Sequence, residues 1–342
     1  MTLKLLRFVV ETFMFHCSSL IWFSAIVLAI AVGFILWYLF VSTCLFSCLT
    51  KSPTFILLFS QAINDIYGLS QSAWQPILRL VGVTNEDFLP NRWLSVIHGS
   101  FELISLPHYI FIALNRALFL IDHTKMGTVF STRKTIILCG FMWIAPLILN
   151  ILLHIFAPKD DAGFYLFGTT LEMGSDSLGI DFQSYISSVF DLSFYVTAVV
   201  VIAIYTIAII WHSYKRRVLI VTTNFITTAT SGSPNFGMEM RLTIVCLMNL
   251  VPPTLTTIID FAWQDRGTIG GFVYAILTMT DNCVNSFVLP LFSQLLRECV
   301  KRKLVRAMFW RKKKEADQTM MLNSRISRAT IITTVSTMKS TV

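Results

Sequence analysis

Long apolar runs separated by short polar segments dominate the chain from residue 18 to residue 295. Each run reaches the roughly 20 residues that an α-helix needs to cross about 30 Å of bilayer hydrocarbon. The pattern predicts an all-α membrane protein, a seven-transmembrane helix bundle. The predicted spans are 18–46, 54–75, 93–121, 134–156, 187–214, 241–263 and 270–295.

The second, third and seventh predicted spans carry ionisable residues inside their apolar runs. These residues are Asp65, His98, Glu102, Arg116 and Asp281. Ionisable side chains inside a membrane nearly always face protein or water instead of lipid. The three spans are therefore expected to face one another in the interior of the bundle.

Lys and Arg in the loops predict the orientation of the bundle. The first, third and fifth loops and the segment after Arg297 are basic. The segment between His154 and Asp191 has one base, Lys159, against acids at 160, 161, 172, 176, 181 and 191. This asymmetry predicts an extracellular N-terminus and a cytosolic tail. The N-terminal Lys4 and Arg7 oppose this assignment but are outnumbered.

The same patterning divides the chain into four parts. Apolar residues recur every three or four positions between the bases that follow the seventh span, which is typical of a helix lying on the inner membrane surface. The remaining tail is rich in Ser and Thr and is expected to be disordered. The parts are a short extracellular N-terminus (1–17), the seven-transmembrane domain (18–295), a cytosolic amphipathic helix (296–310) and the tail (311–342).

Two features of the C-terminal region suggest modification or binding. Cys299 is a candidate for lipidation in the amphipathic helix, with a plain buried thiol as the alternative. The final residues Ser340, Thr341 and Val342 have the form of a ligand for a PDZ domain.

Composition agrees with a membrane protein, with 55% hydrophobic and 13% charged residues. The net charge of +8 comes mostly from the cytosolic tail, beside an anionic leaflet, so it does not indicate nucleic-acid binding. The six His are scattered without metal-ligand spacing, and no nucleophile triad is recognisable. We expect no enzyme activity.

Four short motifs, in the right order and helices, resemble those of rhodopsin-like G-protein-coupled receptors. ALNRA at 113–117 lies where that family has Asp-Arg-Tyr, and Trp143 matches the fourth-helix tryptophan. LFSQAIND at 58–65 resembles the second-helix motif, and NSFVLPLFS at 285–293 resembles the seventh-helix motif, with departures at Leu289 and Ser293. Among these receptors the chain is most similar to the nematode serpentine chemoreceptors, class x or a neighbouring class.

The resemblance implies chemosensory detection of a small molecule or a peptide at the plasma membrane, including a sensory cilium. The implied partners are that ligand, a heterotrimeric G protein, arrestin, a PDZ protein and the lipid bilayer. The alternatives are a seven-helix ligand-gated channel subunit or a non-signalling accessory membrane protein. An opsin is disfavoured because Cys283 stands where a retinal-binding lysine is needed.

Arg116 is expected at the cytosolic end of the third helix, where its guanidinium offers five fixed donors. The resemblance implies that it meets the G-protein α subunit, and the alternative is an interfacial anchor. Asn115 replaces the acid of the family motif, so the usual acid–arginine latch is missing. We expect a looser resting state or a latch from Asp122 or Glu239.

Asp65 is expected to be buried, and a buried carboxylate must be paired, coordinated or protonated. The resemblance implies a sodium pocket formed with Ser105, Asn285 and Ser286. No other metal or cofactor is expected. Because Leu289 replaces an asparagine of that pocket, a protonated Asp65 in a hydrogen-bond network is the equal alternative.

Polar residues toward the outside predict a ligand pocket. His98 and Glu102 are four residues apart and share one face of the third helix. Asp281 and Asn282 are expected to face them from the seventh helix, and the alternative is a salt bridge that only holds the bundle together.

Prolines predict the positions where helices bend. Pro252 and Pro253 are expected to kink the sixth helix and so serve a conformational switch, and Pro290 lies in the seventh-helix motif.

Overall fold

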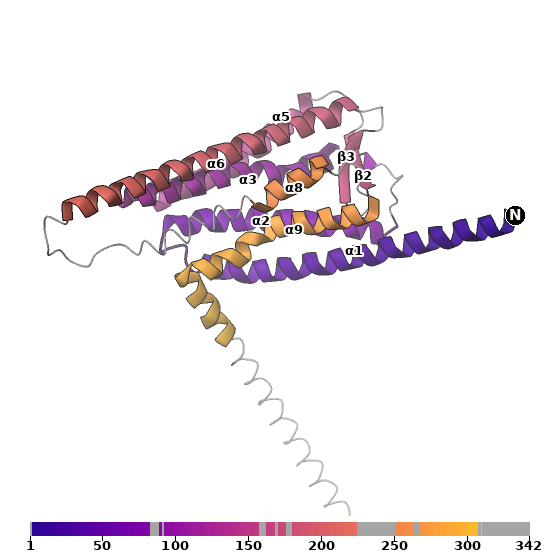
Figure 1. Cartoon of the computed structure of the whole chain (residues 1–342), viewed down its shortest axis with the longest axis horizontal. Coiled ribbons are helices and arrows are strands. Elements are labelled where there is room, and N and C mark those ends of the chain that lie inside the picture. The colour runs from indigo at the N-terminus through magenta and orange to yellow at the C-terminus, as the bar shows by residue number, and fades with distance from the viewer. Residues whose placement is uncertain are drawn as a thin grey trace, which may run out of the picture. The chain divides into compact units, whose positions relative to one another are not determined.

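A bundle of helices forms the main part of the protein in the computed structural model (Figure 1). The structure describes residues 2–82, 89–90, 92–156, 162–167, 170–175, 180–223, 251–262, 267–306 and 309. The chain divides into two units, 1–293 and 294–342. The first contains α1 (Thr2–Phe46), α2 (Pro53–Leu80), β1 (Leu89–Pro90), α3 (Arg92–Ile121), α4 (His123–Val129), α5 (Thr132–Phe156), β2 (Ala162–Phe167), β3 (Thr170–Ser175), α6 (Ile180–Thr223), α8 (Val251–Ala262) and α9 (Gly267–Phe292). In the second, a helix covers 294–306.

Five of the described helices are long and apolar enough to cross a membrane. The spans lie at Leu20–Phe46 in α1, Gly99–Ile121 in α3, Thr132–Phe156 in α5, Leu192–Trp211 in α6 and Ile269–Leu291 in α9. The prediction of a helical membrane protein is confirmed to this extent. Helix α2 overlaps the predicted second span, but it is more polar than these five helices and is not one of them. The described part of the predicted sixth span, 241–263, is the 12-residue helix α8, because residues 241–250 lie outside the described residues. Seven crossings and their orientation stay predictions.

Burial separates interior from peripheral helices. In α3 and α9, 44% of the spanning window is buried, against 11% in α5 and 17% in α1. Helix α2 contacts α1, α3, α5 and α9, and α1, α2 and α9 run side by side in Figure 1. The buried face of α2 carries a row of polar residues, among them Ser60, Gln61, Asn64, Asp65 and Ser72.

A small antiparallel sheet has two of its three strands, β2 and β3, in the acidic segment between the fourth and fifth predicted spans. Strands β2 and β3 pair from Ala162 with Ser175 to Phe167 with Thr170. Strand β1 adds to β2 through Leu89 with Phe164 and Pro90 with Gly163. The hairpin of β2 and β3 contacts α2, α3, α6 and α9. The all-α prediction therefore omits one element, and this element joins the end of the bundle that the loop charges predict to be extracellular.

Helix α1 begins at Thr2 and continues without a break through the first span. That residues 1–17 form a short extracellular N-terminus stays a prediction. The predicted tail, 311–342, lies outside the described residues.

Candidate functional site

The carboxylate of Asp65 is buried where α1, α2 and α9 meet. Its Oδ2 atom accepts hydrogen bonds from the Tyr38 hydroxyl at 2.5 Å and from Asn285 Nδ2 at 3.0 Å. Its Oδ1 atom accepts one from Gln61 Nε2 at 2.5 Å, one turn earlier on α2. Three donors from three helices therefore surround the carboxylate, as a buried anion requires.

The two serines predicted to join Asp65 are engaged elsewhere. Ser105 Oγ accepts a hydrogen bond from Asn64 Nδ2 at 2.6 Å and donates one to the Phe101 carbonyl at 3.0 Å. Ser286 Oγ donates to the Cys283 carbonyl at 2.7 Å. Of the predicted set of four, the structure brings together Asp65 and Asn285.

Near the C-terminal end of α3, Asn115 is hydrogen-bonded to the first turn of α2. Ser52 caps α2 and is followed by Pro53 at the first helical position, which fixes the start of the helix. The Thr54 hydroxyl then donates to Asn115 Oδ1 at 2.7 Å. Asn115 is fully buried, and its Nδ2 atom has no hydrogen-bond partner among the described residues. Arg116, the next residue, is 7% exposed.

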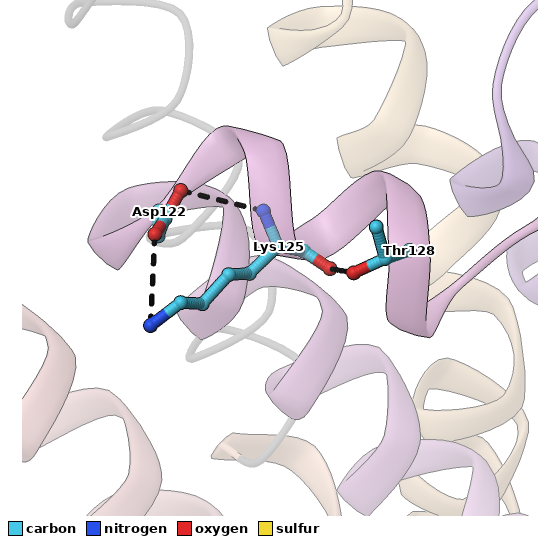
Figure 2. Close-up of polar contacts among 3 residues, drawn as sticks. All are labelled: Asp122, Lys125 and Thr128. Carbon is cyan, nitrogen blue, oxygen red and sulfur yellow. Dashed lines mark hydrogen bonds and ion pairs between the residues drawn. The ribbon is translucent and has the colours of Figure 1, made fainter.

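The acid that was proposed as a substitute latch, Asp122, lies at the start of α4. Its Oδ1 atom accepts the backbone N–H of Lys125 at 3.3 Å, and its Oδ2 atom lies 3.8 Å from Lys125 Nζ (Figure 2). The Thr128 hydroxyl donates to the Lys125 carbonyl one turn later. Asp122 therefore acts as the N-terminal cap of α4. The other proposed latch, Glu239, lies outside the described residues.

The residues predicted for the ligand pocket lie on α3 and α9. The carboxyl groups of Asp281 and Glu102 are close enough for an electrostatic interaction. Glu102 is exposed and Asp281 is partly buried. Asn282 packs against α2, because a Cβ added to Gly68 would lie 2.5 Å from its Oδ1 atom. The side chain of His98 is outside the described part of the structure.

A second polar cluster joins α2, α3 and α5. Trp143 Nε1 donates to Ser60 Oγ at 3.0 Å, and Ser60 Oγ lies 2.8 Å from His108 Nε2. His108 Nδ1 lies 2.8 Å from the Ile104 carbonyl, so this nitrogen carries the proton and Nε2 accepts from Ser60. His108 is fully buried and is neutral in this arrangement.

Replacing Ser60 with alanine is expected to destabilise the protein by about 1–3 kcal/mol, because the buried Trp143 N–H and His108 nitrogen both lose their partner. Thermal unfolding of the purified chain measures this. Ser70→Ala is the matched control on α2, since the exposed Ser70 hydroxyl bonds only its own helix at the Ile66 carbonyl. Equal melting temperatures for the two variants would contradict the role of Ser60.

Sequence reasoning missed Tyr38, Gln61, Thr54 and His108. Gln61 lies one helical turn before Asp65, and this i, i+4 spacing could have predicted a hydrogen bond between the two side chains. Tyr38 stands in an apolar run with no pattern that separates it from the other aromatic residues.

The remaining predicted residues have the following places. Pro252 and Pro253 lie in the first turn of the described α8, and Pro290 lies near the end of α9. Cys299 is 7% exposed in the helix 294–306. Ser340 and Val342 lie outside the described residues.

The chain matches no protein-family model and no curated protein.

Proposed function

We propose that the chain is a rhodopsin-like G-protein-coupled receptor, most similar to the nematode serpentine chemoreceptors. It binds a small molecule or a peptide outside the cell and activates a heterotrimeric G protein inside. The hydrogen bond between Asp65 and Asn285, 220 positions apart, gives the strongest support. Two motifs recognised separately in the sequence meet in one buried network. The plasma membrane, including a sensory cilium, is the proposed location, and arrestin and a PDZ protein are the proposed partners of the tail.

In this proposal α3 connects the ligand site in the outer half of the bundle to the G-protein site at its cytosolic end. Glu102 and Asp281 bind the ligand in the outer half of the bundle. Arg116 lies 14 residues after Glu102 on the same helix, a rise of about 21 Å. A ligand that binds the active conformation more tightly shifts the population toward it. The hydrogen bond between Asn64 and Ser105 ties the middle of α3 to α2, so a shift of α3 changes the polar core as well.

A ligand screen tests the proposal directly. The full chain is expressed with a promiscuous G protein, and intracellular calcium is recorded for a library of small molecules and peptides. A responding ligand is expected to lose potency in Glu102→Ala and Asp281→Asn at equal surface expression. Failure of every ligand to evoke a G-protein response, with the chain at the cell surface, speaks against a receptor.

The orientation of the chain separates the receptor from an odorant-receptor-like channel, which has its N-terminus inside. An epitope tag at the N-terminus is expected to bind antibody on intact cells, and a tag at the C-terminus only after permeabilisation, because the basic loops are cytosolic. Staining of both tags in permeabilised cells is the control. A cytosolic N-terminus would exclude the proposed receptor.

A further inference from the structure

The atoms that face Asp65 are hydrogen-bond donors. The Tyr38 hydroxyl and Asn285 Nδ2 point at Oδ2, and Gln61 Nε2 points at Oδ1. A sodium ion needs the opposite arrangement, because hard cations are held by the lone pairs of several oxygen atoms. The donor set therefore suits a carboxylate that is held by protein groups alone.

The serines that the family resemblance assigns to a sodium pocket do not supply the missing oxygens. Ser105 Oγ is occupied by Asn64 and by the Phe101 carbonyl, and Ser286 Oγ is turned to the Cys283 carbonyl on its own helix. The side chain at 289 is a leucine, 3% exposed, which offers no ligand atom. These residues do not fit a sodium ion beside Asp65.

We infer that the Tyr38 hydroxyl takes the place of a cation at Asp65, so that α1, α2 and α9 are joined by a hydrogen-bond cage around the carboxylate, in which only Gln61 Oε1 is without a partner among the described residues, and the protein is insensitive to sodium. Tyr38 is 1% exposed, and α1 packs against both α2 and α9, so the phenol is held where it donates to Oδ2. In this role Tyr38 is a positioning residue that keeps the Asp65 carboxylate facing Asn285. The inference concerns the core of the bundle and holds whether or not the chain couples to a G protein.

Thermal unfolding of the full chain in nanodiscs tests the inference without any signalling readout. The melting temperature is measured at constant ionic strength while choline chloride is replaced by sodium chloride. The wild-type melting temperature is expected to be the same in both salts. A saturable rise with sodium that Asp65→Asn abolishes would overturn the inference, and this arm needs no variant at Tyr38.

The second arm removes the donor. Tyr38→Phe is expected to melt several degrees below wild type, because Asp65 Oδ2 loses one of its two partners. The matched control is Tyr195→Phe on α6, where the side chain is 52% exposed. This control is expected to melt like wild type. If Tyr38→Phe melts no lower than Tyr195→Phe, the hydroxyl does not hold Asp65 and the proposed cage is wrong.

Discussion

Replacing Arg116 with alanine is expected to abolish ligand-evoked G-protein activation while the chain still reaches the cell surface. The guanidinium supplies five donors near the end of α3 that the loop charges predict to be cytosolic, and alanine supplies none. Hydrogen bonds to a charged group are worth about 1.5–3 kcal/mol, and 1.4 kcal/mol corresponds to about tenfold in an equilibrium constant. Activation is therefore expected to fall by at least about tenfold. The measurement is G-protein activation at saturating ligand, normalised to surface expression.

Arg133→Ala is the matched control for Arg116→Ala. Arg133 is exposed in the first turn of α5, on the side that the loop charges predict to be cytosolic. It changes the net charge by the same amount without touching the end of α3. The control is expected to signal as wild type. Normal signalling by Arg116→Ala would show that this residue anchors the helix at the membrane interface and does not couple to a G protein.

The bundle interior was predictable from the sequence because burying a charge in lipid is costly. Asp65 and Arg116 are buried as this argument predicts, and Asp281 is partly buried, whereas Glu102 is exposed. The same argument cannot identify what Asp65 binds. Its partner on α1, Tyr38, comes from an apolar run in which tyrosine looks like any lipid-facing aromatic residue. Only the packing of α1 against α2 and α9 brings the phenol to the carboxylate.

The sheet was missed for a different reason. Each strand is short, and β1 contains two residues, Leu89 and Pro90. A two-residue strand has no alternating pattern, and proline is unfavourable inside a sheet, although an edge strand accepts it. The pairing with β2 depends on where α2 ends and α3 begins, which is a tertiary effect. Hydropathy along the chain carries no information on that register.

The hydrogen-bond partner of Asn115, near the C-terminal end of α3, could not be predicted from the sequence either. Its position before Arg116 marked the absence of an acid, but its actual partner, Thr54, is 61 residues away in the sequence. The contact depends on the packing of α2 against α3. Asn115 thus joins two helices beside Arg116 without adding a charge, and this arrangement makes a direct experiment possible.

Replacing Asn115 with aspartate is expected to lower basal signalling in the absence of ligand. The two side chains have nearly the same shape, so one carboxylate oxygen still accepts the Thr54 hydroxyl and the other replaces the buried Nδ2. The new negative charge attracts the Arg116 guanidinium by roughly 2 kcal/mol at a separation of about 7 Å and an effective dielectric of about 20. Holding Arg116 in this way favours the resting state, and basal activity is expected to fall by about tenfold.

The control for this variant is Asn115→Leu, which also removes the buried Nδ2 but brings no charge. Its basal signalling is expected to stay at or above the wild-type level, since it also breaks the Thr54 contact that holds α3 to α2. Basal G-protein activation is compared at equal surface expression for the three proteins. If aspartate and leucine lower it equally, charge is not the cause. If aspartate leaves it unchanged, the resting position of Arg116 is set by another group, and the missing acid at 115 has no consequence for basal signalling.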